Sequence, residues 1–303
     1  MFGVGDLVLV WVSGGPDSLC LLETLVRIRR LFRIRLAVFH MDHGLRPGSG
    51  GDAAYVRRRA GAHGVPCHVA SPWTAPPRGG SVERWAREER RAAAARIANE
   101  IDASRSALGH TMDDRAETVL LALLRGWGLD GLAGIEPVAD GIVRPLLDVR
   151  RDETVAACRS LGLRPRHDPS NTDTSYLRNA IRHEVLPTLT SATGRDVVPT
   201  LARTADLLRA DASMLDELAV GLGANILERD RLGWALRADT LADLAPPIAS
   251  RVVRHALAAA GIEWSRAAID GVLDLASGRP GRRIELGDGW SARRVRARIV
   301  LER

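Results

Sequence analysis

Lysine is absent from the sequence: all 43 of its basic Lys and Arg residues are arginine. Without lysine, the chain has no side-chain amine to act as a nucleophile, to form a Schiff base or to bind phosphate in a Walker A loop. These kinds of active site are therefore excluded. A reactive primary amine has to come from a substrate or from the chain's own N-terminus.

Cysteine is scarce as well. The three cysteines, Cys20, Cys67 and Cys158, are far apart and form no CxxC pair, so the sequence predicts no zinc ribbon, iron–sulfur cluster or disulfide framework. The apolar run near the N-terminus stops after about seven residues and follows no basic segment, which is too short for a signal peptide or a membrane span. We expect a cytoplasmic protein with no membrane partner.

The composition is that of a folded protein with an excess of positive charge. Hydrophobic residues make up 46% and charged residues 26% of the chain, as in ordinary globular proteins. Its 303 residues allow two domains, because single cores seldom grow beyond roughly 250 residues. The net charge of +6 favours a polyanionic partner, since guanidinium groups bind phosphate and release its counterions.

The first part of the chain alternates between strands and helices. Short apolar runs that end at Gly, His or Ser-Pro are typical of buried parallel strands. The alternation predicts an α/β fold with a doubly wound parallel sheet, in which ligands bind at the carboxyl ends of the strands. The expected strands are 7–12, 34–39, 65–69 and 106–108, and the expected helices between them are 17–30, 52–63 and 82–100.

The rest of the chain has mostly helical signals. Helices are expected at 113–125, 150–161 and 176–186, the last of them stopped by Pro187 because proline cannot continue a helix. We expect a catalytic domain over 1–200, a helical linker over 201–225 and a small α+β domain over 226–303. The small domain should contain a helix at 250–260 and a Gly-rich basic tail.

A glycine-rich loop follows the first strand directly. It reads Ser13-Gly14-Gly15-Pro16-Asp17-Ser18 and precedes a helix. Glycines permit a tight turn in which backbone N–H groups converge on an anion at the helix N-terminus. Asp17 beside a phosphate indicates a bound Mg²⁺ or a substrate amine. The alternative is an ordinary strand-to-helix turn with Asp17 as a helix cap.

Two polar clusters follow later strands. The first, at 40–46, contains His40, His43 and Arg46; taken alone, its histidines are more often packing or loop residues. The second opens the helix expected at 113–125. Asp113 and Asp114 lie four and three residues before Glu117, so the carboxylates share a helix face. With His110, they could hold Mg²⁺, bind an ammonium group and accept its proton. Compensation of the helix dipole is the alternative explanation.

These motifs, in this order, resemble the tRNA(Ile)-lysidine synthetase family of the PP-loop (N-type ATP pyrophosphatase) superfamily. The 13–18 loop resembles its PP-loop, 40–46 resembles its HGLR segment, and 110–118 resembles His-His-x-Asp-Asp-Gln-x-Glu-Thr with Thr111 and Arg115 as departures. Further similar segments extend the match over about residues 7–190, among them Asp168-Pro169-Ser170-Asn171. The ordered set is much more specific than any single motif.

The resemblance implies roles for individual residues. For the nucleotide they are Ser13, Gly14, Gly15, Pro16, Asp17, Ser18, His43 and Arg46. For catalysis they are Asp17, His110, Asp113, Asp114 and Glu117, with Mg²⁺ held by Asp17 and Asp114. For contact with tRNA and substrate they are Arg178, Asn179 and Arg182.

The resemblance also implies an activity. Members adenylate the wobble cytidine of a CAU-anticodon isoleucine tRNA with ATP, and the ε-amine of free L-lysine then displaces AMP. Another PP-loop tRNA enzyme such as a cytidine thiolase, or a non-catalytic tRNA-binding protein, is the alternative. We expect the arginines at 282–283 and 293–298 to contact tRNA. A homodimer is one oligomeric state that the sequence allows.

Overall fold

The computed structural model describes residues 1–45, 48–77, 81–230 and 233–303. They form two compact units, Met1–Asp206 and Leu207–Arg303, and the boundary falls within the long helix α9 (Val198–Gly223). Among the described residues, no helix combines the length and the apolar character that crossing a membrane requires.

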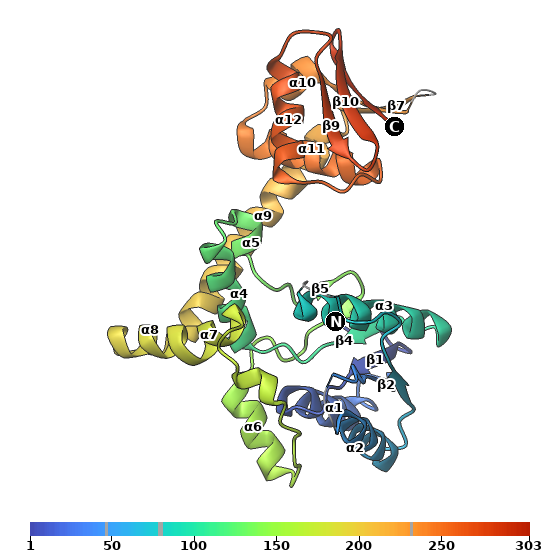
Figure 1. Cartoon of the computed structure of the whole chain (residues 1–303), viewed down its shortest axis with the longest axis vertical. Coiled ribbons are helices and arrows are strands. Elements are labelled where there is room, and N and C mark those ends of the chain that lie inside the picture. Colours follow the sequence, from blue (N-terminus) through green and yellow to red (C-terminus); the bar gives the residue numbers. More distant parts are fainter. Residues whose placement is uncertain (46–47, 78–80, 231–232) are drawn as a thin grey trace. The chain divides into compact units, whose positions relative to one another are not determined.

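A six-stranded sheet forms the centre of the N-terminal unit (Figure 1). Its order is β3 (Cys67–Ala70), β2 (Arg35–Met41), β1 (Leu7–Trp11), β4 (Arg105–Ala107), β6 (Ile142–Val143) and β5 (Val138–Ala139). Neighbouring strands are parallel except β5, which is antiparallel to β6. The predicted doubly wound sheet is confirmed. The order reverses between β1 and β4, and α/β proteins bind ligands at such a switch point.

Helices cover both faces of this sheet. Val8 and Leu9 of β1 are both fully buried, although successive side chains of a strand point to opposite faces. Val8 packs with side chains of α1, α2 and α6, whereas Leu9 packs with α3. Burial on both faces explains why the strand is apolar throughout. These helices are α1 (Pro16–Ile28), α2 (Ser49–Ala62), α3 (Val82–Glu100) and α6 (Arg151–Ser160).

A helical layer follows β4. Its elements are α4 (Met112–Leu124), α5 (Leu129–Leu132), the 3-10 turn η1 (Pro169–Thr172), α7 (Leu177–Ala180), the π-helical segment η2 (Ile181–Val185) and α8 (Leu186–Thr193). Ile181 and Leu186 pack against Ala116 and Leu120 of α4. This packing fixes the 177–193 region beside the start of α4, where the predicted acid cluster lies.

The expected stop at Pro187 is wrong. The helical path runs through Pro187, which lies in the first turn of α8, and continues to Thr193. A proline ring inside an α-helix meets the carbonyl four residues earlier. The wider π-type turn of η2 immediately before Pro187 accommodates that ring, so the helical path continues past the proline.

The C-terminal unit has its own sheet and core. Its antiparallel sheet has the order β7 (Leu227–Asp230), β8 (Gly233–Arg237), β11 (Arg298–Glu302), β10 (Trp290–Val295) and β9 (Arg283–Gly287). Three helices lie against it (Figure 1) and contribute side chains to one apolar cluster with it: α10 (Ala238–Ala242), α11 (Pro246–Ala259) and α12 (Arg266–Ser277). The sequence predicted α11 but not α12, and its basic tail is three ordered strands.

Candidate active site

The glycine-rich loop between β1 and α1 is a tight turn held from within. The Ser18 hydroxyl accepts hydrogen bonds from the backbone N–H groups of Ser13 and Gly14, both at 3.2 Å, and donates to the Gly15 carbonyl at 3.0 Å. Gly14 has a φ of +93°, which residues with a Cβ rarely adopt. Pro16, the first residue of α1, has no N–H, and the N–H groups of Asp17 and Ser18 that follow have no partner within the helix.

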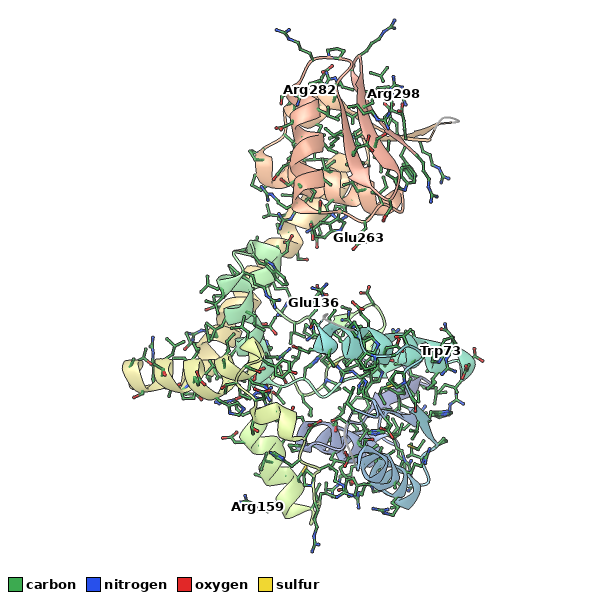
Figure 2. The ribbon with its side chains drawn as sticks, in the orientation of Figure 1. Trp73, Glu136, Arg159, Glu263, Arg282 and Arg298 are labelled. Carbon is green, nitrogen blue, oxygen red and sulfur yellow. The ribbon has the colours of Figure 1, made fainter. Side chains whose placement is uncertain are left out.

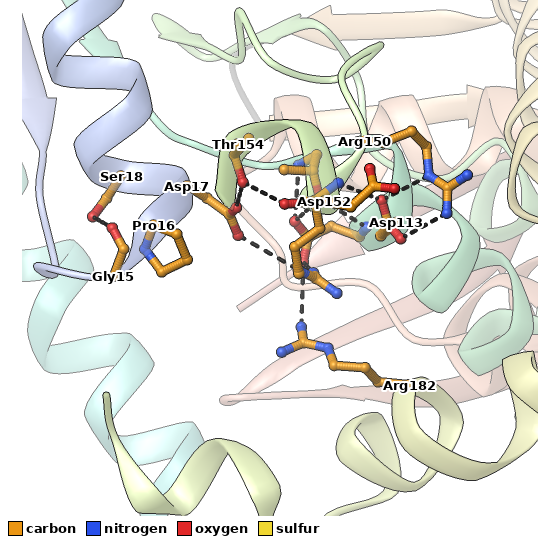
Figure 3. A network of polar contacts seen from close by, with 12 residues as sticks. Gly15, Pro16, Asp17, Ser18, Asp113, Arg150, Asp152, Thr154 and Arg182 are labelled. Atoms are coloured by element: carbon orange, nitrogen blue, oxygen red, sulfur yellow. Dashed lines mark hydrogen bonds and ion pairs between the residues drawn. The ribbon is translucent and has the colours of Figure 1, made fainter. Parts of the chain in front are cut away.

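Asp17 does not cap the helix. The N-cap of α1 is Gly15, with no side-chain cap hydrogen bond, so the alternative explanation of Asp17 as a cap is wrong. Its carboxylate instead accepts a hydrogen bond from the Thr154 hydroxyl and lies 3.5 Å from Nε of Arg151 (Figure 3). Burial raises the pKa of Asp17, while the Thr154 hydrogen bond and the Arg151 charge act in the opposite direction.

The end of β4 approaches this loop closely at Gly109. A Cβ added to Gly109 would lie 3.0 Å from the carbonyl oxygen of Asp17 and 3.1 Å from its carbonyl carbon. Only glycine therefore lets the chain after β4 pass so near the start of α1. This close approach places His110 and α4 next to the loop.

Asp114 lies in the first turn of α4 and is fixed by the residue that caps this helix. Its Oδ2 accepts hydrogen bonds from the backbone N–H of Thr111 at 2.8 Å and from the Thr111 hydroxyl at 2.9 Å, in a capping box. Burial alone would raise the pKa of Asp114, but the charges of Arg151 and Arg178 and the Thr111 hydrogen bond lower it to about 2. Asp114 is therefore ionised over the whole physiological pH range.

Glu117 is surrounded by guanidinium groups. Its side chain is 0% exposed and accepts hydrogen bonds from Arg151 (2.9 Å), Arg178 (2.8 Å) and Arg182 (2.7 and 3.2 Å). Arg151 and Arg178 also contact Oδ1 of Asp114, at 3.0 and 3.2 Å. Burial would raise the pKa of Glu117, but these guanidinium groups, Arg182 foremost, lower it.

Asp113 has a separate set of partners. Its carboxylate accepts from Arg150 at 3.1 Å and from the backbone N–H of Arg151 at 2.8 Å, at the N-terminal end of α6 (Figure 3). Burial would raise its pKa, but Arg150 and the Arg151 N–H lower it. Asp113 therefore anchors α6 to α4, and its expected catalytic role stays a prediction.

His110 is held by Arg144. Nε of Arg144 lies 3.2 Å from Nδ1 of His110. Burial lowers the pKa of His110 to about 4, with Asp114 opposing and Arg144 adding to the shift. The imidazole is therefore neutral at pH 7 and a weak base.

The loop and the acid cluster share one pocket of about 860 Å³, within the usual size range for small-molecule sites. Asp17, Asp114, Arg151 and Arg182 line it, whereas Asp113, Glu117, Arg178 and Asn179 do not. Apolar side chains form another part of the wall. The lining also includes Ser13, Gly15, Ser18, Phe39, His40, Met41, His43, Leu45, Leu108, His110 and Asp168.

The remaining predicted positions have varied surroundings. His40 is buried, and its Nδ1 lies 2.7 Å from the Val12 carbonyl oxygen, to which it donates. Burial lowers the pKa of His43. Arg46 lies outside the described residues. Asn179 donates to the Asp173 carbonyl at 2.9 Å, which orders the segment before α7.

Asp17 and Asp114 are the two carboxylates predicted to bind a metal ion. In the parts of the chain that the structure describes, no group of three or more His, Cys, Asp or Glu side chains is placed to hold a metal ion. The predicted pair Asp17 and Asp114 lines one pocket, with the Arg151 guanidinium contacting both carboxylates. Mg²⁺ commonly takes only one or two carboxylates and completes its shell with phosphate and water, so this pair fits an ion that arrives with a nucleotide.

Three functional contacts were missed in the sequence: Arg151 and Thr154 at Asp17, and Arg144 at His110. One signal was available. Arg150 and Arg151 stand at the start of α6, where positive charge opposes the helix dipole. Two arginines at that position indicate partners elsewhere, and both have carboxylate partners on α4.

The two departures from the family motif have structural roles. Thr111 caps α4. Arg115 is buried and donates to Asp148 at 2.9 Å, to the Ala202 carbonyl at 3.0 Å and to Asp206. Neither side chain lines the pocket.

Two family descriptions match this chain. Residues 5–189 match the PP-loop domain, and residues 236–300 match the TilS substrate binding domain. The first match contains the whole site described above. The second lies in the C-terminal unit.

Several curated proteins are similar to the chain. A tRNA(Ile)-lysidine synthase of Symbiobacterium thermophilum is 48% identical over 72% of this chain and 47% of the relative. The protein of the same name from Solibacter usitatus is 38% identical over 93% of this chain and 64% of the relative. The one from Salinispora arenicola is 41% identical over 81% of this chain and 74% of the relative. The chain thus spans about half the length of the Symbiobacterium thermophilum relative and about two thirds the length of the Solibacter usitatus relative.

A solved structure shares the fold. The U34-tRNA thiolase NcsA from Methanococcus maripaludis, with its [4Fe-4S] cluster, superposes with a TM-score of 0.57 over 68% of this chain and 73% of that chain. The sequence identity is 16%, so this likeness concerns the fold alone.

Proposed function

The chain belongs to the tRNA(Ile)-lysidine synthase family of PP-loop proteins, and we propose that it ligates free L-lysine to C2 of the wobble cytidine of a CAU-anticodon isoleucine tRNA. The reaction uses ATP and releases AMP and pyrophosphate. One observation supports the proposal: the glycine-rich loop at 13–18, which includes Asp17, and the α4 carboxylate Asp114 line the same pocket. A nucleotide and an amine can therefore meet there.

The chemistry has two steps. The C2 oxygen of the cytidine attacks the α-phosphorus of ATP, the bond to the β-phosphate breaks, and pyrophosphate leaves. The lysine ε-amine, after losing a proton, attacks C2, and the C–O bond breaks to release AMP. Adenylation is needed because a pyrimidine carbonyl oxygen is a poor leaving group.

We assign the proton acceptance to Asp17 in preference to the other groups. A general base works best with a pKa near the working pH. Burial raises the pKa of Asp17 above its usual range, whereas the pKa of Asp114 is lowered to about 2 and that of His110 to about 4. The last two are weak bases at neutral pH, so electrostatic attraction of the ammonium suits Asp114 better than proton transfer.

Mg²⁺ enters this proposal with the nucleotide. When bound, it supplies positive charge that stabilises the departing pyrophosphate. Asp17 and Asp114 would hold it during adenylation, so their roles toward the amine belong to the later transfer step. The first-turn N–H groups of α1 hold the phosphates.

The RNA is the expected polyanion for the arginine-rich surface. A single-stranded anticodon loop lets a base splay out into a pocket, and Arg182 lines this pocket. We assign ATP binding and catalysis to residues 1–200, a linking role to 201–225 and tRNA binding to 226–303. The cytoplasm, where free lysine, ATP and tRNA occur together, is the proposed compartment.

The direct test combines the full chain with the purified tRNA, Mg²⁺-ATP and radiolabelled lysine. We expect label in the tRNA and release of AMP and pyrophosphate that depends on the tRNA. Asp17→Ala should abolish pyrophosphate release, while Glu100→Gln, an exposed carboxylate in an i,i+4 pair with Arg96, should leave it unchanged. Normal turnover of Asp17→Ala would refute the assignment of the loop.

The same assay separates the alternatives. A cytidine thiolase would add sulfur, and mass analysis of the nucleoside distinguishes sulfur from a lysyl adduct. Cys20 and Cys158 are buried, and burial raises the pKa of both thiols, which makes them weak nucleophiles. A non-catalytic tRNA-binding protein would form no AMP with or without tRNA.

A further inference from the structure

Arg151 contacts both halves of the site. Its Nε lies 3.5 Å from the Asp17 carboxylate at the phosphate loop, and its two terminal nitrogens lie 3.0 Å from Asp114 and 2.9 Å from Glu117 on α4. The side chain also lines the pocket. A single guanidinium thus bridges the site of the nucleotide and the site of the incoming amine.

The α4 carboxylates are already saturated with donors. Both oxygens of Glu117 accept guanidinium hydrogen bonds, and its side chain is 0% exposed. On Asp114, Oδ2 accepts from Thr111, and Oδ1 accepts from Arg151 and Arg178. A lysine ammonium cannot pair closely with these carboxylates until one guanidinium withdraws, because each oxygen already has its partners.

Charge indicates which guanidinium moves. Asp17, Asp114 and Glu117 are balanced by Arg151, Arg178 and Arg182, three charges of each sign. A triphosphate remains net negative with one Mg²⁺ bound, so it adds negative charge beside Asp17, and a guanidinium binds phosphate oxygens through two parallel hydrogen bonds. Arg151 already contacts Asp17. Its backbone N–H stays bound to Asp113, so only its side chain has to turn.

We propose that Arg151 is a positioning residue that closes the amine site in the nucleotide-free protein and opens it when a triphosphate binds the loop. The nucleotide draws the guanidinium away from Asp114 and Glu117, and the substrate ammonium takes its place. Nucleotide and lysine therefore bind with positive coupling. This inference rests on the proposed function, since it takes lysine as the amine and ATP as the nucleotide.

Calorimetric titration of lysine into the full chain tests the coupling. It is done without nucleotide and with Mg²⁺ and α,β-methylene-ATP, which cannot be cleaved between the α and β phosphates. We expect the analogue to lower the lysine Kd by about tenfold, within the usual range of coupling between sites. By reciprocity, lysine lowers the Kd of the analogue by the same factor.

Variants assign the coupling to Arg151. Arg151→Met should bind lysine more tightly than the wild type when no nucleotide is present, and its ratio of Kd values should fall to about one. Arg151→Lys keeps the charge but cannot bridge Asp17, Asp114 and Glu117 with one ammonium, so its ratio should be reduced. The control is Arg159→Met, on the exposed outer part of the same helix (Figure 2), which should keep the wild-type ratio.

Three results would overturn the inference: a wild-type ratio near one, no lysine binding in the presence of the analogue, or an unchanged ratio in folded Arg151→Met. Circular dichroism establishes whether the variant folds, and if it does not, the wild-type ratio and Arg151→Lys still decide. The turnover assay with labelled lysine distinguishes failure of the Arg151 inference from failure of the proposed function. Lysine transfer to the tRNA without coupled binding refutes only the role of Arg151, and absence of transfer refutes the proposed function.

Discussion

Arg144 donates its Nε–H to Nδ1 of His110 across 3.2 Å. A guanidinium can only donate, so Nδ1 accepts and the neutral ring carries its proton on Nε2. Protonation of His110 would place an N–H against an N–H, beside a positive charge and in a largely buried position. The neutral form of His110 is therefore part of the folded site.

This relationship predicts a loss of stability in acid. The folded pKa of His110 is about 4, below the usual value near 6.5, so the unfolded chain takes up this proton first as pH falls. The contribution is complete above pH 6.5 and is lost as pH falls from there towards 4. Between pH 7 and pH 5 the loss is about 2 kcal/mol. Urea unfolding at both values should show it, and His110→Asn should lose correspondingly less than the wild type. Equal losses in both proteins would contradict the prediction.

Gly109→Ala should damage the loop without removing any functional group. The new Cβ would lie 3.0 Å from the Asp17 carbonyl oxygen, so the backbone of the loop has to shift. Overpacking of this kind costs about 1–3 kcal/mol, and the KM for ATP should rise. Thermal unfolding and pyrophosphate release measure the two effects.

Gly61→Ala is the matched control for that change. Gly61 lies in α2, and its added Cβ meets nothing within 4 Å. Alanine is the better helix former by about 1 kcal/mol, so this variant should be slightly more stable and have an unchanged KM for ATP. A Gly109→Ala protein that behaved like Gly61→Ala would show that the close approach is unimportant.

The local pattern of the chain predicted four of the six strands of the N-terminal sheet and missed the two-residue strands β5 and β6. Contacts between distant segments of the sheet were only partly predictable. Apolar runs at the spacing of buried strands predicted β1 to β4, and the carboxyl-end rule for parallel sheets brought the 13–18 loop and the 110–118 segment together. The contact of Asp17 with Thr154 joins positions 137 residues apart. No periodicity in either segment specifies such a pair.

The missed features have physical reasons. Pro187 predicts a helix stop because proline disrupts α-helices, but the π-type turn before it changes the backbone geometry. The arginines at 293–298 are predicted to contact tRNA, but Arg294 is buried and donates to the Ala276 carbonyl and to Asp239 instead. Arg294 therefore ties α12 and α10 to the sheet. A charged residue can be interior when its donors find partners.

Arg115→Gln restores the family's residue and should reduce stability without altering ATP use. The change removes donors to Asp148, Asp206 and the Ala202 carbonyl. Asp148 is 89% and Asp206 50% exposed, so both stay hydrated and the loss should be about 1–3 kcal/mol. Urea unfolding measures it, and kcat/KM for ATP should be unchanged because Arg115 lies outside the pocket. A large fall in kcat/KM would show that the α4–α9 contact positions Asp114.

Replacing Arg282 and Arg283 together by alanine should weaken tRNA binding through lost phosphate contacts. Both are exposed on the C-terminal unit, as Figure 2 shows for Arg282, and the visible ion pair of Arg283, to Glu285, is a surface pair that contributes little to stability. If each arginine neutralises one phosphate, the slope of log K against log salt should become shallower by about 2. Filter binding from 50 to 200 mM salt, roughly the range over which such effects are large, measures the slope. The adjacent exposed pair Arg57 and Arg58 on α2 removes the same charge in a control variant. If both double variants made the slope equally shallow, the net charge of the protein and not the C-terminal surface would account for tRNA binding.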